Sequence, residues 1–158
     1  MRKRIVNQSS EQANKKPVEQ DWLDIEDLVE VEISSEDNAH PVESALLPGN
    51  DSGWRASAPG EQTLRLVFNT PQNIKTIMLK FEEPAVTRTQ QYVLRWSGDA
   101  GQPSEIVRQQ WNFSPDGASS ENEIHHVELA GVKVLELSII PNISGGDSVA
   151  SLEELRIA

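Results

Sequence analysis

The sequence of 158 residues contains no cysteine, and only 5% of its residues are aromatic. Without cysteine the chain has no disulfides, thiolate metal ligands or cysteine nucleophiles. It also lacks any apolar run near the roughly 18 residues that span a bilayer. No apolar run follows the basic start Met1-Arg2-Lys3-Arg4, so we predict no secretory signal. Together these absences predict a soluble, cytoplasmic protein without a membrane partner.

Basic residues are scarce and unevenly placed. The net charge is -11, yet residues 1 to 16 contain five Lys or Arg against Glu11 alone, a net of +4. The stretch from Pro17 to Glu43 then contains ten acids and no Lys or Arg. A body of this charge repels phosphate backbones, so nucleic acid is not expected as a partner.

Two regions follow from composition. Residues 1 to 20 are polar with almost nothing to bury, and we predict a disordered tail there. Residues 21 to 158 are predicted to form one domain, with no internal repeat and no long helix. Alternating apolar residues and turn signals predict eight short strands: 29–33, 64–68, 74–81, 92–97, 106–113, 124–129, 132–140 and 152–157. This pattern is typical of an all-β fold, an eight-stranded antiparallel β-sandwich or jelly roll.

The segment from Gln62 to Phe81 is the centre of the predicted fold. Leu64, Leu66 and Phe68 share one face of the first strand, and Ile77, Leu79 and Phe81 share the buried face of the second. Residues 69 to 73 include a proline and two asparagines, so they predict a tight hairpin turn. A second hairpin is predicted across Ala130-Gly131.

Long and short connections alternate along the predicted strands. If the strands simply run up and down, the long loops gather at one end of the sandwich. These loops are 35–61, 82–91, 114–123 and 141–151. Loops supported by a rigid scaffold usually carry the binding function, so this end is the predicted ligand site.

At this point the chain resembles a family, the discoidin or coagulation-factor C-type domain, a galactose-binding-domain-like jelly roll. The resemblance covers residues 28 to 158 and depends on several short motifs in the expected order. They are Glu36–Pro41, Ser44–Leu46, Gly53–Arg55, Pro59–Glu61, Leu64–Phe68, Tyr92–Trp96, Gly98–Gly101, Val132–Leu137 and Glu154–Ile157. The flanking cysteines of extracellular members are missing here.

The resemblance and the loop pattern together suggest five ligand-binding residues: His40, Trp54, Arg55, Arg88 and Asn142. For Trp54, the family pattern favours core packing over sugar stacking. Arg55 then points outward and can bind hydroxyls or a carboxylate, although a plain surface arginine is an equal alternative. Arg88 can instead pair with the glutamates of its own loop, and His40 can be a simple turn residue.

The resemblance also implies a structural calcium as a possible cofactor. Sugar-binding members place a calcium-ligating Asp where this chain has Leu47. Asn50, Asp51 and Glu154 are the remaining candidate ligands, which supply only part of the six to eight oxygens that calcium takes.

Other candidate residues are interpreted as structural. Trp96 and Trp111 lie within apolar strands and are predicted core residues. His125 and His126 are adjacent on one strand, so they face opposite sides of the sheet and cannot bind one metal together. No acid pair is singled out by its spacing, and no catalytic motif is present, so an enzyme ranks last.

Two functional hypotheses remain. The leading one is a monomeric, non-catalytic module that recognises a carbohydrate or a similar polar ligand through the long-loop end. The alternative is an intracellular adaptor domain that binds a protein and no sugar. The missing secretory signal and Leu47 favour the adaptor, whereas the loop pattern favours the ligand-binding module.

Overall fold

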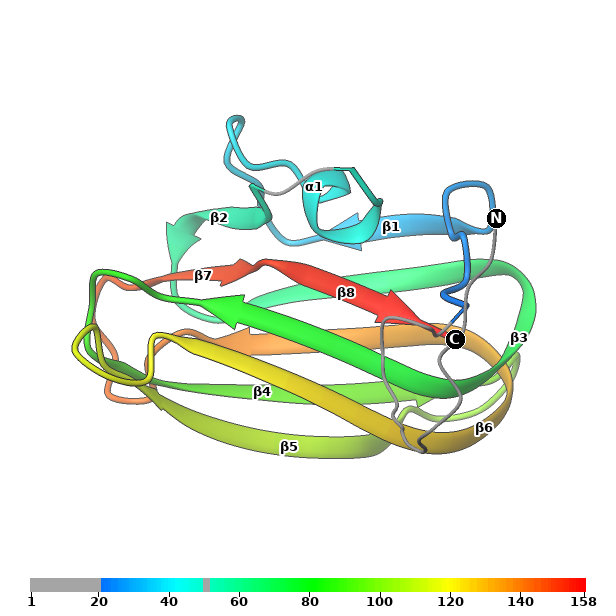
Figure 1. Cartoon of the computed structure of the whole chain (residues 1–158). Helices are drawn as coiled ribbons and strands as arrows, with labels where there is room; N and C mark the ends of the chain where they lie inside the picture. Colours follow the sequence, from blue (N-terminus) through cyan, green and yellow to red (C-terminus); the bar gives the residue numbers. More distant parts are fainter. Residues whose placement is uncertain (1–20, 50–51) are drawn as a thin grey trace, which may run out of the picture.

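Two long strands organise the fold because each runs through both layers of a β-sandwich (Figure 1). They are β3 (Gln62–Glu82) and β6 (Ser120–Ile140), and they pair with each other along most of their length. The computed structural model describes residues 21–49 and 52–158. The predicted disordered tail, residues 1–20, therefore lies outside the described part.

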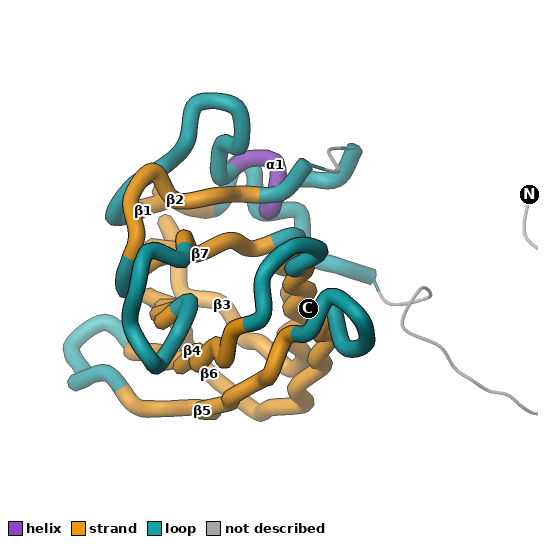
Figure 2. Tube along the Cα trace, turned by 90° about the vertical axis from the view of Figure 1, so that its left-hand side faces the viewer, coloured by secondary structure: helices purple, strands orange, loops and turns teal. Residues whose placement is uncertain are grey.

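The remaining strands complete two facing layers (Figure 2). In the larger sheet the strand order is β1-β3-β6-β4-β5, with β8 paired to the second half of β3. A small second sheet contains β2 and β7. The bounds are β1 (Val29–Ile33), β2 (Trp54–Pro59), β4 (Arg88–Ser97), β5 (Ser104–Phe113), β7 (Val149–Leu152) and β8 (Glu154–Ile157). All these pairings are antiparallel, as the sequence predicts.

The two predicted hairpins are correct as chain reversals but wrong in their strand pairing. Residues 69–73 and Ala130-Gly131 do reverse the chain, but the two halves of each strand do not pair with one another; these are the points where β3 and β6 bend together from one layer into the other. The register shifts there, from Val67 opposite Val134 to Ile74 opposite Leu129, but pairing continues on both sides. Proline and glycine mark a sheet corner as readily as a hairpin turn, so the local signal is the same.

The predicted buried faces of this segment are confirmed. Ile77, Leu79 and Phe81 are fully buried, and Leu64 and Leu66 are 1% exposed. Because β3 crosses between layers, its two halves contribute to the core from opposite sides. At about 25 cal/mol per Å² of apolar surface, this burial is the main stabilising contribution to the sandwich.

Three elements were not predicted. The strand β2 and the short helix α1 (Glu43–Leu46) lie within the segment expected to be an irregular loop, and the closing strand is split at Glu153 into β7 and β8. The close approach of β7 to Gly53 explains the start of β2. Gly53 has φ +68°, and a Cβ there would lie 2.8 Å from the carbonyl oxygen of Leu152.

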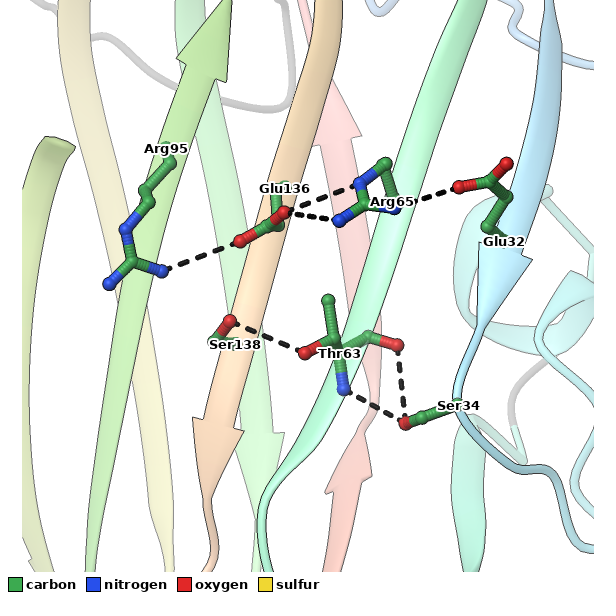
Figure 3. Close-up of polar contacts among 7 residues, drawn as sticks. All are labelled: Glu32, Ser34, Thr63, Arg65, Arg95, Glu136 and Ser138. Carbon is green, nitrogen blue, oxygen red and sulfur yellow. Dashed lines mark hydrogen bonds and ion pairs between the residues drawn. The ribbon is translucent and has the colours of Figure 1, made fainter. Parts of the chain in front are cut away.

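The outer face of the larger sheet carries a row of charges that crosses four strands (Figure 3). Arg65 lies 2.9 Å from Glu32 and 2.8 Å from Glu136, and Arg95 lies 3.4 Å from the other oxygen of Glu136. Exposed pairs of this kind usually contribute less than about 1 kcal/mol each. This row of two acids and two arginines therefore neutralises its own charge and adds little to stability.

Three of the predicted long loops do gather at one end of the sandwich, on the left in Figure 1. The amide of Glu83 donates to Ser119 (2.8 Å), and that of Ile143 donates to Thr89 (2.9 Å), which brings loops 83–87, 114–119 and 141–148 together. The turn at Gly60 joins them through Ser148. Within the described residues no helix is long and apolar enough to cross a membrane.

Trp111 is only partly buried, although the sequence predicts a core residue. Its indole Nε1 is shielded from solvent and has no hydrogen-bond partner within the described chain. We expect Trp111→Ala to lower the free energy of unfolding by about 1 to 3 kcal/mol, below the roughly 3 to 5 of a fully buried tryptophan. Urea denaturation beside Trp54→Ala tests this ranking. A larger loss for Trp111→Ala would contradict it.

Candidate functional site

Trp54 fixes the start of the candidate site without facing a ligand. Its side chain is 1% exposed, and its Nε1 donates to the carbonyl oxygen of Ser35 at 3.0 Å. The amide of Ser57 donates to the hydroxyl of Ser35 at 3.0 Å. Trp54 is therefore a core residue, the alternative that the sequence favours, and it ties the loop after β1 to β2.

Arg55 and His40 are brought together by backbone bonds between this loop and β2. The amide of Asp37 donates to the carbonyl of Arg55 (2.8 Å), and the amide of Arg55 donates to the carbonyl of His40 (3.2 Å). Arg55 lies between the buried residues Trp54 and Ala56, so strand alternation directs it outward, and it is exposed. Its guanidinium has no ion pair among residues 21–49 and 52–158.

Asp37 orients His40. Its Oδ2 lies 2.8 Å from Nδ1 of His40 and also accepts the amide of Ala39 at 3.3 Å. The hydrogen bond from His40 is the main cause that lowers the pKa of Asp37, so this carboxylate is ionised and can only accept. Nδ1 of His40 therefore carries the proton, and its Nε2 remains available for a ligand.

Asp37 is the site residue that sequence reasoning missed. The signal for it is the spacing Asp-x-x-His just before Pro41, which suits an aspartate turn closing on a histidine three residues later. The site thus offers Arg55 as a donor and Nε2 of His40 as an acceptor in its neutral form. A ligand with neighbouring hydroxyl groups can satisfy both, because each hydroxyl donates and accepts.

Arg88 does not join this site, because it is 3% exposed and its Nε and Nη1 bind groups inside the protein, although its buried Nη2 has no partner among the described residues. Its Nε lies 2.8 Å from Glu83, its Nη1 donates to the carbonyl of Pro141 at 2.7 Å, and its guanidinium lies 4.8 Å from the ring centre of Phe113. Burial alone would raise the pKa of Glu83, but Arg88 and two loop amides lower it overall. Arg88 therefore joins two loops, which agrees with the pairing alternative.

Asn142 is also used internally. Its side-chain oxygen accepts a hydrogen bond from the amide of Ser144 at 3.0 Å, and its backbone carbonyl accepts one from the amide of Gly145 at 2.9 Å. These bonds shape the loop after β6. The side-chain nitrogen of Asn142 has no hydrogen-bond partner in the described chain. Among residues 21–49 and 52–158 no hydrogen bond connects Asn142 with Arg55 or His40, so it is not part of their site.

The predicted calcium ligands receive no support from the described residues. Asn50 and Asp51 lie outside the described part of the chain. Glu154 is paired with Arg156, whose Nη2 lies 3.0 Å away. Among residues 21–49 and 52–158 no three His, Asp or Glu side chains are placed to hold a metal. Glu154 alone does not make a site for a cation, and calcium binding stays a prediction.

The structure singles out one acid pair that spacing alone does not. Glu121 and Glu123 lie on the inner face of β6, and Glu121 is 1% exposed with both carboxylate oxygens unpartnered among the described residues. Burial, reinforced by the charge of Glu123, raises the pKa of Glu121 to about 7. Further along the same face, His125 lies 2.7 Å from the Tyr92 hydroxyl. Because Glu121 is buried within the sandwich, the pair of Glu121 and Glu123 affects the stability of the fold rather than the binding of a ligand at the surface.

No protein-family model matches the sequence, and no curated protein matches it either. Solved structures do match in fold. The family 32 carbohydrate-binding module of NanJ from C. perfringens, determined with galactose, is 15% identical with a TM-score of 0.61, covering 82% of this chain and 92% of that one. The corresponding module of AlyQ, determined with 4,5-unsaturated mannuronic acid, is 17% identical with a TM-score of 0.60, covering 84% and 95%.

A third module, CpGH89CBM32-6 from Clostridium perfringens, is 16% identical with a TM-score of 0.60 and covers 87% of this chain and 98% of its own. At these identities the likeness concerns the fold, and it extends over nearly the whole length of each module. The described chain has the discoidin-type, galactose-binding-domain-like jelly-roll fold of the family 32 carbohydrate-binding modules.

Proposed function

We propose that this chain is a non-catalytic module that binds a carbohydrate, or a similar hydroxyl-rich ligand, at Asp37, His40 and Arg55. The observation that carries the proposal is the exposed Arg55 guanidinium, which has no ion pair among residues 21–49 and 52–158, on a strand whose backbone bonds to that of His40, the histidine that Asp37 orients. Fold relatives determined with galactose and with an unsaturated uronic acid support the ligand class.

The contacts available predict weak binding. Trp54 is buried, so no aromatic ring of the site can stack on a sugar face. One arginine and one histidine on an open surface provide a few hydrogen bonds, each contributing roughly 0.5 to 3 kcal/mol. We therefore expect dissociation constants in the range of about micromolar to millimolar. The ligand class includes uronic acids, because a guanidinium can hold a carboxylate with two parallel bonds.

A glycan array with the full chain, followed by calorimetric titration of the best sugar, tests the proposal. Arg55→Ala should weaken binding by about tenfold or more, with stability unchanged within about 0.5 kcal/mol because the side chain is exposed. The matched control is Arg108→Ala, which removes an exposed arginine on β5 that already pairs with Glu105 at 2.9 Å. Absence of binding at millimolar sugar would reject the proposal, as would equal losses in the two variants.

A further inference from the structure

The strand β1 has a free edge. It lies at one end of the strand order, and among residues 21–49 and 52–158 it pairs with β3 alone. The carbonyl of Leu28 accepts from Asn69 and the amide of Ser34 donates to Thr63, so even-numbered residues direct their backbone groups toward β3. The N–H and C=O groups of Val29, Val31 and Ile33 therefore point away from β3. Within the described chain they have no backbone partner.

An apolar groove adjoins this edge. A cavity of about 410 Å³ lies between β1 and α1, and its apolar lining includes Val29, Val31, Val42 and Leu46. Val29 and Val31 are the same residues whose backbone groups face the open edge. A strand added beside β1 would place every second side chain over this groove, because side chains alternate between the faces of a sheet.

The surroundings of the groove are acidic. Glu26 and Glu43 line it, and Glu30 projects from β1; all three are exposed and have no ion pair among residues 21–49 and 52–158. Glu32 differs, because Arg65 neutralises it (Figure 3). A second copy pairing through β1 would bring like charges face to face, which is destabilising. The charge therefore selects a basic partner over self-association.

We propose that the β1 edge binds an extended, basic segment of a partner protein in which Lys or Arg residues alternate with apolar ones. The backbone of this segment pairs with Val29, Val31 and Ile33, and the apolar side chains of the segment enter the groove. The basic side chains of the segment lie near Glu30 and the acids that line the groove. Short charged edges also protect sheets from uncontrolled pairing. An edge that only needs protection from uncontrolled strand pairing does not require an apolar groove beside it. The groove therefore favours a binding role for the β1 edge.

The test uses the full chain and a fluorescent synthetic peptide in which Lys alternates with Val, with a Glu–Val peptide as control. Fluorescence anisotropy should show binding of the Lys–Val peptide only, weakening by about tenfold between 0.05 and 0.5 M salt as the charges are screened. Binding should be independent of Arg55, since Arg55→Ala leaves the β1 edge intact. Equal binding of the two peptides, or no binding, would overturn the proposal.

Two variants identify the surface. Val31→Pro removes an outward N–H without taking a bond from β3, so binding should be lost while the fold is retained. Glu30→Lys should weaken binding by about tenfold, whereas Glu128→Lys, at an exposed position on β6, should not. If Val31→Pro fails to fold, the affinity of Glu30→Lys for the peptide still tests whether the peptide binds at the β1 edge. Unchanged affinity in Glu30→Lys, or self-association through β1 in place of peptide binding, would reject the inference.

Discussion

Glu121→Gln is expected to stabilise the protein at pH 8 by up to about 3 kcal/mol and to have little effect near pH 4.5. Burial and Glu123 raise the pKa of Glu121 to about 7 in the folded state, against 4.5 for an unperturbed glutamate. Between these values the folded chain binds a proton that the unfolded chain has released. The contribution of Glu121 to the stability of the parent therefore falls as the pH rises from about 4.5 through 7.

Glutamine resembles the protonated carboxyl group and does not titrate, so the variant keeps the stability that the parent loses. His125 acts in the opposite direction, because burial lowers its pKa and disfavours its charged form at low pH. Taking the difference between parent and variant isolates Glu121, since His125 is common to both. Melting temperatures measured from pH 4 to pH 8.5 provide this difference.

Glu128→Gln is the matched control for this experiment. Glu128 lies on the same strand but on the exposed outer face, so its replacement should leave the pH profile unchanged. Glu123→Gln should give an intermediate profile, because it removes the neighbouring charge but leaves Glu121 buried. If Glu121→Gln and the parent lose stability in parallel as pH rises, Glu121 is hydrated and its pKa is not raised.

The sequence predicts the composition of the layers better than the path of the chain. Leu64, Leu66, Ile77 and Leu79 fall on the predicted buried faces because side-chain alternation is a local property. The bend at residues 69–73 depends on β6 bending alongside β3, a long-range condition that no local turn signal contains. For the same reason β2 was missed: in the described part of the chain its strand partner is β7, almost a hundred residues away.

The candidate site was predicted in part for a similar reason. Alternation beside a buried Trp54 is enough to direct Arg55 outward, and the structure agrees. That His40 and Asp37 lie against Arg55 depends on backbone bonds between a loop and a strand, which spacing does not reveal. Arg88 was misplaced because its burial comes from Phe113 and Pro141, residues contributed by two other segments.

Arg88→Ala is expected to lower the free energy of unfolding by about 3 to 5 kcal/mol while leaving ligand binding by the folded protein unchanged. The substitution leaves the half-buried Glu83 carboxylate without its cation and the carbonyl of Pro141 without its donor. Breaking a buried pair from one side is costly because the remaining charge is still poorly solvated. It also removes the stacking of the guanidinium on Phe113.

Two further variants separate charge from geometry. Arg88→Lys keeps the positive charge but cannot reach Glu83 and Pro141 with one planar group, so it should recover only part of the lost stability. Glu83→Gln keeps the shape of the partner and removes its charge. Urea denaturation measures stability, and titration with the sugar selected for the parent, at a temperature where each variant is folded, measures binding. If Arg88→Ala melts within a degree of the parent but fails to bind, Arg88 belongs to the ligand site after all, and the loops that it joins are stabilised by other contacts.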